Sequence, residues 1–177
     1  KETRPTIVLH LAAEVGGIGA NNLYPGQFFY NNLLMGAYMI EQARVFGVDK
    51  FVSIGTVCSY PQITEVPFKE TALWSGYPEP TNAPYGLAKK MQLVQLEAYR
   101  KQYSFSGIHV LPSNLYGPHD HFDPEMGHVI PALLTKFYDA KFSDVDSVVL
   151  WGDGSPSREF LHARDCADGL ILAAQKW

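Results

Sequence analysis

The chain has 177 residues, which is enough for one well-buried domain or for one domain and part of another. Of these residues 46% are apolar and 18% are charged, as in an ordinary soluble globular protein. The net charge of −4 excludes the basic surface that binds nucleic acid, and no apolar run approaches the roughly 20 residues that cross a bilayer, so we expect neither nucleic acid nor a membrane as a partner.

Strand-like and helix-like segments alternate along the chain, beginning with a continuous apolar run at residues 6–12. Such a run is typical of a strand that is covered on both faces. The further predicted elements, in chain order, are a helix at 26–46, a strand at 50–55, a helix at 84–103, a strand at 107–111, a helix at 129–141, a short strand at 148–151 and a helix from 165. This alternation predicts βαβ units and therefore an α/β fold with a parallel sheet.

Three unusual stretches follow the predicted strands: EVGGIGANN at 14–22, TVCSYP at 56–61 and SNLYGPHDHF at 113–122. Parallel strands place the loops that follow them at the carboxyl edge of the sheet, where open α/β sheets bind ligands. The connection at 56–83 is also unusually long, and long loops in compact domains tend to be functional. The sequence therefore predicts a ligand site at this edge.

Tyr85 and Lys89 (PYGLAK) are four residues apart on a predicted helix, so their side chains share one face. A lysine cation favours the phenolate form of a nearby tyrosine, which makes the tyrosine a better acid or base near neutral pH. Such a pair can protonate a carbonyl oxygen while hydride reaches its carbon. On spacing alone, a surface tyrosine lying over a lysine stem explains the motif equally simply.

Thr56 and Cys58 follow the end of a strand, and His128 begins a helix. The Thr56 hydroxyl could bind a substrate oxygen, and the Cys58 thiol could act as a base if its surroundings favour the thiolate. The alternatives are a small buried apolar cysteine and a histidine that only caps its helix. With Cys166 as the one other cysteine, no disulfide framework or metal site is predicted.

The glycine-rich stretch at 16–22 lacks the third glycine of the dinucleotide-binding motif, with Asn22 in its place. We therefore expect a tight glycine turn that lets backbone approach a ligand, not a phosphate loop. Farther along, Trp151 and Arg158 flank the turn GDGSPS. They offer a stacking surface and a cation suited to phosphate oxygens, although a hairpin with an exposed arginine fits the same residues.

Six motifs in order, HLAAEVGGIGANN, GTVCSYP, EPTNAPYGLAK, PSNLYGPHDHF, GHVIPALL and WGDGSPSREFLH, resemble the GDP-L-fucose synthase family of the extended short-chain dehydrogenase/reductases. The resemblance spans nearly the whole chain. It implies an NADP-binding Rossmann domain, a doubly wound parallel sheet that is incomplete at its N-terminus and occupies residues 1–117. Residues 118–177 would form part of a smaller substrate domain with a return segment to the Rossmann domain.

The same resemblance implies an NADPH-dependent epimerase-reductase that converts GDP-4-keto-6-deoxy-D-mannose to GDP-L-fucose. Tyr85 would be the reductase acid and Lys89 its partner, Thr56 the active-site hydroxyl, Cys58 the base that epimerises C3 and C5, and His128 the acid. Cofactor contacts would come from Ala12, Ala13, Gly55, Thr56, Tyr85, Lys89, Pro112, Asn114, Leu115 and His128. Substrate contacts would come from Lys136, Trp151 and Arg158, and no metal is implied.

The chain departs from the family pattern at Val57, where a hydroxyl residue is common, and at Lys136, where arginine is expected. It supplies no glycine-rich phosphate turn, so we expect a longer polypeptide or a truncated copy. Two alternatives stay open: a GDP-mannose 3,5-epimerase-like enzyme, against which the motifs around His128 and NLYGPHDHF speak, and an inactive fragment that acts as an interaction module. The family further implies a homodimer that uses helices such as 26–46 and 84–103. The N-terminus shows no signal-peptide pattern, so we expect a cytoplasmic location.

Overall fold

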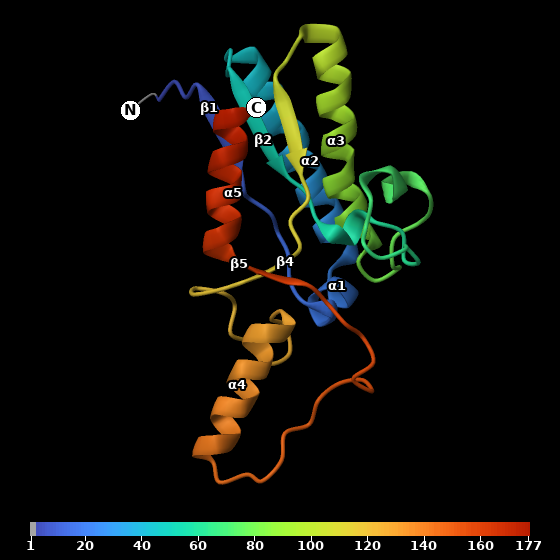
Figure 1. The fold of residues 1–177 in the computed structure, drawn as a ribbon, viewed down its shortest axis with the longest axis vertical. Helices are drawn as coiled ribbons and strands as arrows, with labels where there is room; N and C mark the ends of the chain where they lie inside the picture. Colours follow the sequence, from blue (N-terminus) through green and yellow to red (C-terminus); the bar gives the residue numbers. More distant parts are fainter. Residues whose placement is uncertain (1–2) are drawn as a thin grey trace.

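The computed structural model describes residues 3–177, and a three-stranded parallel sheet lies at its centre (Figure 1). The strands are β1 (Ile7–His10), β2 (Lys50–Ile54) and β3 (Gly107–Val110), in the order β1-β2-β3. Phe51 of β2 lies opposite Val8 of β1 and Gly107 of β3. The predicted α/β class and the predicted parallel sheet are confirmed.

The middle strand β2 is buried on both faces, because its successive side chains point to opposite sides of the sheet. Phe51 packs on one face in a cluster with Ile40, Ala43, Val48, Leu96 and Phe105. Val52 packs on the other face with Cys166, Leu170 and Ala174. The two clusters explain why adjacent residues of this strand, Phe51 and Val52, are both apolar.

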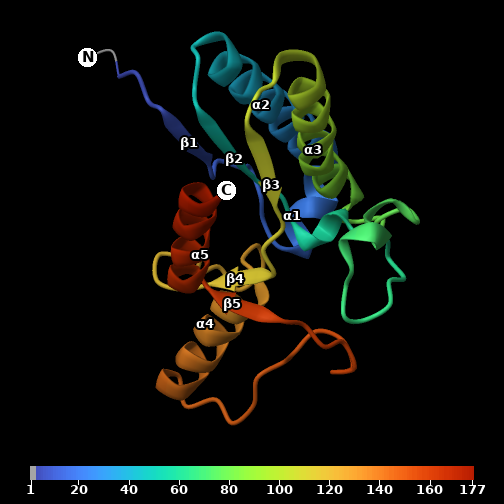
Figure 2. The same cartoon turned by 45° about the horizontal axis from the view of Figure 1, so that its top comes forward.

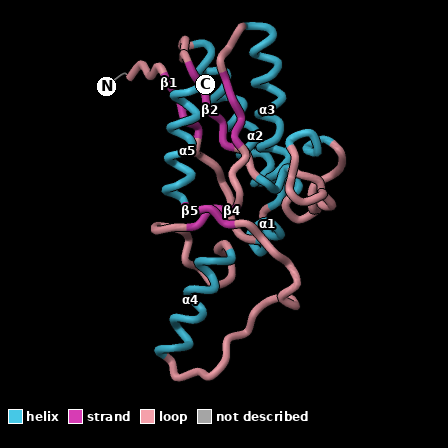
Figure 3. Tube along the Cα trace, in the orientation of Figure 1, coloured by secondary structure: helices cyan, strands magenta, loops and turns pink. Residues whose placement is uncertain are grey.

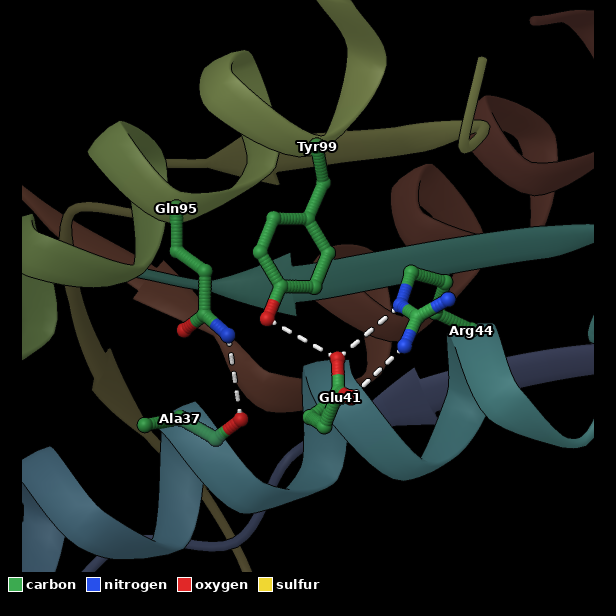
Figure 4. A network of polar contacts seen from close by, with 5 residues as sticks. All are labelled: Ala37, Glu41, Arg44, Gln95 and Tyr99. Carbon is green, nitrogen blue, oxygen red and sulfur yellow. Dashed lines mark hydrogen bonds and ion pairs between the residues drawn. The ribbon is translucent and has the colours of Figure 1, made fainter. Parts of the chain in front are cut away.

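Helices α2 (Pro25–Val45) and α3 (Ala83–Tyr103) lie side by side on the Phe51 face (Figure 2). A polar network joins them near their C-terminal ends (Figure 4). Arg44 donates two hydrogen bonds to the Glu41 carboxylate, at 2.7 and 2.9 Å, and the Tyr99 hydroxyl donates a third at 2.9 Å. These donors, Arg44 first, lower the pKa of Glu41 to about 2. The carboxylate therefore stays charged and fixes α3 against α2 at any ordinary pH.

Helix α5 (Ala163–Lys176) covers the opposite face, against Val52. Lys50 donates a hydrogen bond of 2.9 Å from its amine to the carbonyl of Ala174 in the last turn of α5. A cation at this end is favourable, because the C-terminus of a helix carries partial negative charge. The return of the chain to the sheet thus uses both apolar packing and a charged contact.

Beyond the carboxyl ends of the central strands lie a short ribbon of β4 (Asn114–Tyr116) and β5 (Phe160–His162), and then α4 (Val129–Phe142) (Figure 1). The predicted strand at 148–151 is wrong: the chain between α4 and β5 is a loop (Figure 3). Val149 and Trp151 are 78% and 67% exposed, and no other described segment pairs with them. An apolar run without a partner strand cannot satisfy its backbone groups as a sheet.

The remaining helices are short: α1 (Ile18–Leu23), and the 3-10 turns η1 (Val57–Ser59) and η2 (Glu70–Trp74) in the long connection. The predicted bounds of the longer helices agree with the structure within one or two residues. Between residues 3 and 177, no helix has the length and apolar character that a bilayer span requires.

Candidate active site

Four of the five predicted catalytic residues meet where β2 ends and α3 begins. Thr56 directly follows β2 and caps η1, with its Oγ1 accepting a hydrogen bond of 3.2 Å from the backbone N–H of Cys58. Cys58 lies within η1, whereas Tyr85 and Lys89 lie in the first two turns of α3. Pro84 suits the start of that helix, because proline has no N–H that would need a partner there.

The first turn of α3 packs tightly against η1. The Ser59 hydroxyl donates a hydrogen bond of 2.8 Å to the carbonyl of Gly86. A Cβ atom on Gly86 would lie only 2.3 Å from the carbonyl oxygen of Cys58, so glycine is required for this approach. The contact places Cys58 next to Tyr85.

Burial sets the protonation states of the tyrosine–lysine pair. Tyr85 is 8% exposed and Lys89 is 1% exposed. Burial, and then the Cys58 charge, raise the pKa of Tyr85, while burial alone lowers the pKa of Lys89 to about 8. The shift of Tyr85 toward the phenolate that its spacing from Lys89 predicts is not found, because burial outweighs it and raises the pKa. At neutral pH the site holds a neutral phenol one helical turn from a buried ammonium group, and this phenol can donate a proton to a substrate oxygen.

Lys90, the residue after Lys89, fastens the long connection to α3. Its amine donates hydrogen bonds to the carbonyls of Leu73 and Ser59 and lies 4.1 Å from the centre of the Trp74 ring. Lys90 is 2% exposed, which a lysine tolerates only when its charge is paired or hydrogen-bonded. Sequence reasoning missed this contact, because nothing in the sequence distinguishes Lys90 from an exposed helix lysine.

The glycine-rich stretch forms α1 and a close contact within the chain. The N–H of Gly17 donates a hydrogen bond of 2.9 Å to the carbonyl of Met126, and a Cβ on Gly17 would lie 2.3 Å from the carbonyl oxygen of Gly127. The predicted glycine turn that approaches a ligand is not found: the stretch leads into helix α1, and its close backbone approach is made to residues 126–127 of the chain itself. Ala12 and Ala13, just before this stretch, are exposed at the end of β1.

His128 is separated from the other four predicted catalytic residues in the chain and occupies the N-cap position of α4, without a side-chain cap hydrogen bond. The contact of Gly17 with residues 126–127 brings the segment before α4 to the start of α1. The Nδ1 atom of His128 lies 3.7 Å from a carboxylate oxygen of Asp120, which also accepts a hydrogen bond of 2.8 Å from the N–H of His121. Asp120 is a neighbour that sequence reasoning did not single out.

The predicted substrate residues lie farther from the sheet. The Lys136 amine is 4.7 Å from the centre of the Trp151 ring, and both residues line a pocket of about 390 Å³ together with Asp139 and Val149. Arg158 does not line this pocket; its guanidinium donates to the carbonyl of its neighbour Ser157. The structure therefore joins Lys136 to Trp151 and leaves Arg158 exposed on the loop.

The predicted cofactor residues after β3 lie in β4 or just before it. Asn114 donates a hydrogen bond of 3.0 Å from its amide to the carbonyl of Glu159, so it holds the start of β5. Pro112 and Leu115 flank it, and Gly55 is buried at the end of β2. All of these positions lie along the carboxyl edge, as the topology predicts.

Comparison with known proteins shows the family to which this fold and sequence are similar. The model of a family described as "NAD dependent epimerase/dehydratase family" matches residues 1–177. The GDP-L-fucose synthase of Sinorhizobium fredii is 44% identical over 169 residues, covering 96% of this chain and 54% of that protein. The Escherichia coli GDP-L-fucose synthase is 44% identical over 170 residues, covering 94% of this chain and 53% of that protein. The chain thus spans about half the length of the curated relatives it matches.

Solved structures give the same picture. A GDP-L-fucose synthetase from Naegleria fowleri bound to NADP matches with a TM-score of 0.85 and 37% identity, over 95% of this chain and 55% of that one. A GDP-6-OMe-4-keto-L-xylo-heptose reductase from C. jejuni matches with a TM-score of 0.87 and 28% identity, over 97% of this chain and 57% of that one. The resemblance to the GDP-L-fucose synthases that the ordered motifs indicate is confirmed.

Proposed function

The chain belongs to the NAD dependent epimerase/dehydratase family, and we propose that it carries the catalytic residues of an NADPH-dependent epimerase-reductase acting on GDP-4-keto-6-deoxy-D-mannose. The observation that carries the proposal is the buried pair Tyr85 and Lys89, held against Cys58 at the carboxyl edge of the sheet. The relatives named GDP-L-fucose synthase support this substrate over that of a GDP-mannose 3,5-epimerase-like enzyme.

The reductase step needs a proton donor for the carbonyl oxygen at C4. Tyr85 is neutral at pH 7, since burial raises its pKa further above neutrality, so it can donate that proton. Lys89, charged below pH 8, then stabilises the phenolate that remains. NADPH, when bound, supplies the hydride.

The proposed cofactor fits the residues at this edge. The exposed end of β1 at Ala12 and Ala13, the Thr56 hydroxyl and the Lys89 amine offer polar groups for the nicotinamide ribose half. No carboxylate among residues 3–177 offsets the lowered pKa of Lys89, which leaves its amine available to ligand oxygens. Asn114, Pro112 and Leu115 extend the same edge.

The epimerase step uses the acidity that a ketone gives to its neighbouring C–H bonds. In the proposed sequence, Cys58 removes the proton at C3 or C5 to form an enolate, and His128 returns a proton to the opposite face. Both carbons are inverted before C4 is reduced, because reduction abolishes the ketone. Lys136 and Trp151 would hold the nucleotide end of the substrate, with a cation for phosphate oxygens and a ring for stacking. Arg158 would add a second cation for the diphosphate.

A homodimer is also proposed, through the outward faces of α2 and α3. Apolar and aromatic side chains are exposed there, and include Tyr30 at 62%, Tyr38 at 64% and Phe46 at 79%. Surfaces of this kind favour a protein partner. The cytoplasmic location stays a prediction.

The first test incubates the full-length protein with NADPH and GDP-4-keto-6-deoxymannose. We expect NADPH oxidation and a GDP-6-deoxyhexose product; no NADPH consumption would contradict the proposed reaction. The same assay with a GDP-4-keto-heptose in place of this substrate tests the alternative of a heptose reductase, as in one of the similar solved structures. Faster NADPH oxidation with the heptose would favour that alternative.

The second test separates the two proposed steps with Cys58→Ser. A serine hydroxyl is a far weaker base than a thiolate, so we expect uptake of solvent deuterium at C3 and C5 to fall by a factor of about 100 or more. Reduction of the unepimerised ketone should fall much less. Equal loss of both activities would show that Cys58 is not the epimerisation base. Cys166→Ser, at a buried cysteine on the α5 face of the sheet, is the matched control.

A further inference from the structure

Three polar residues form a row across the otherwise apolar sheet, directly beneath α3. His10 of β1 lies opposite Ser53 of β2, and Ser53 lies opposite His109 of β3. Ser53 is fully buried, His10 is 4% exposed, and His109 is partly buried. Burying polar side chains inside a sheet costs free energy unless they are hydrogen-bonded. The hydrogen bonds of these residues therefore indicate how each side chain is protonated and oriented.

The hydrogen bonds of the row fix the protonated nitrogen of His109. The Ser53 hydroxyl donates a bond of 2.6 Å to the amide oxygen of Gln92, which can only accept. The Ser53 oxygen lies 3.1 Å from Nδ1 of His109, and because its one proton is already used, it accepts there. With the Gln92 amide in this orientation, which leaves its nitrogen without a partner among the described residues, the bonds assign the Nδ1–H tautomer to His109. Its Nε2 atom carries a lone pair and, among the described residues, has no hydrogen-bond partner.

The free Nε2 atom lies at the end of the sheet that carries the catalytic residues. A Cβ on Gly55, the residue before Thr56, would lie 2.3 Å from it. Gln92 is three residues after Lys89, so the two share one face of α3, and the bond from Ser53 to Gln92 fixes that face over the row. The imidazole thus lies beneath α3 with Nε2 toward the end of the sheet that carries the catalytic residues, near enough to Lys89 for the lysine charge to lower the pKa of His109.

We propose that His109, held in this tautomer by Ser53 and accompanied by His10, is a positioning residue that stabilises the buried ammonium group of Lys89 from beneath. The proposal rests on the proposed function, in which that ammonium group serves Tyr85. His109 touches neither substrate nor cofactor and acts only through Lys89.

The electrostatics of the neighbourhood support a neutral row. Burial, and then the Lys89 charge, lower the pKa of both His10 and His109 to about 4, so neither competes with Lys89 as a cation near neutral pH. The other titratable groups on the elements packed at this level are Cys58 of η1 and Tyr85 of α3 itself. From α2, the uncharged Gly36 packs against Gln92.

The experiment begins with the tautomer, which does not depend on activity. Side-chain ¹H–¹⁵N spectra of the full-length protein should show His109 as neutral Nδ1–H, without protonation from pH 8 down to about 5. A neutral Nε2–H tautomer, or a titration near the ordinary histidine value, would overturn the proposal. A protein that fails to turn over the GDP-sugar would contradict the proposed function but would leave this spectrum unchanged.

The matched variant is His109→Asn, whose amide nitrogen can still donate to Ser53 but which has no counterpart of Nε2. We expect its Lys89 to titrate about 0.5 to 1 unit lower by side-chain ¹⁵N spectroscopy, since the charged form loses its dipole partner. The alkaline limb of the pH profile of ketone reduction should move by the same amount, with the rate at pH 6.5 changed less than about twofold. Titration of Lys89 that matches the unsubstituted protein would overturn the proposal. If His109→Asn does not fold, the same Lys89 titration is made in Ser53→Ala, which removes the hydroxyl that orients His109; a Lys89 titration unchanged from that of the unsubstituted protein would overturn the proposal.

Discussion

At the scale of single residues, the tyrosine–lysine motif gains its meaning from burial. Four-residue spacing on a helix is common, whereas a lysine 1% exposed beside a buried tyrosine is not. The Gly86 contact is the local reason that this pair meets Cys58, because only glycine lets the carbonyl of Cys58 approach α3 so closely. The contact between η1 and α3 therefore depends on the absence of a side chain at residue 86.

Gly86→Ala tests that contact. Alanine is favoured over glycine by about 1 kcal/mol in a helix, but its Cβ would lie 2.3 Å from the carbonyl oxygen of Cys58, and backbone cannot yield as a flexible side chain can. We expect a net loss of about 1 to 3 kcal/mol in the free energy of unfolding, together with a loss of epimerase activity. Gly169→Ala is the control, because a Cβ in that part of α5 meets nothing within 4 Å. It should raise the unfolding free energy by about 0.5 to 1 kcal/mol in the same denaturant titration. A stabilised Gly86→Ala would contradict the described contact.

At the scale of elements, sequence patterns predicted helices well and short strands poorly. The ends of α2 and α3 follow from local signals, such as Pro84 in the first turn and the polar residues after Tyr103. The ribbon of β4 and β5 was missed, because its two three-residue strands are far apart in the sequence and only the tertiary fold pairs them. The run at 148–151 has strand-like composition but pairs with no strand among residues 3–177, so its prediction failed because pairing depends on the tertiary fold.

The candidate site shows the same division. Thr56, Cys58, Tyr85 and Lys89 follow from topology, since each belongs to a segment that a parallel sheet brings to its carboxyl edge. The bond between Ser53 and Gln92 was not predictable, because it depends on the register of three strands and the rotation of α3 above them. A histidine or serine inside a strand pattern was the only available signal.

The attachment of the long connection to α3 gives a prediction for a whole element. Lys90→Met keeps the apolar stem but removes the amine that binds the carbonyls of Leu73 and Ser59. We expect η2 to detach more often, so that proteolysis within residues 62–77 becomes about fivefold to tenfold faster, as for a loss of about 1 to 1.4 kcal/mol. Lys101→Met, at an exposed position of the same helix, is the matched control. Equal cleavage rates in the two variants would show that Lys90 does not fasten the connection.

At the scale of the whole molecule, the two buried histidines link stability to pH. Both have a folded-state pKa of about 4, below the ordinary value of 6.5. As pH falls below 6.5 the unfolded chain therefore takes up protons that the folded chain refuses, and the folded state loses stability until about pH 4. Within this window each histidine contributes a slope of about 1.4 kcal/mol per pH unit. Lys89, whose pKa is lowered to about 8, acts with the same sign but only at alkaline pH, where stability should rise as pH increases.

Urea titrations of the protein at pH 5 and pH 7 measure the effect, with a lower unfolding free energy expected at pH 5. In His109→Asn the difference in unfolding free energy between pH 5 and pH 7 should shrink by about 1 to 2 kcal/mol. The variant lacks one of the two histidines that bind a proton in the unfolded chain but not in the folded one. The control is His119→Asn: His119 is exposed with a φ of 70°, a left-handed conformation that asparagine adopts readily, so its substitution leaves the buried row intact. An equal pH difference in both variants would show that the row is not the source of the linkage. A smaller difference in His109→Asn alone would tie the acid sensitivity of the whole fold to the polar row beneath its proposed catalytic lysine.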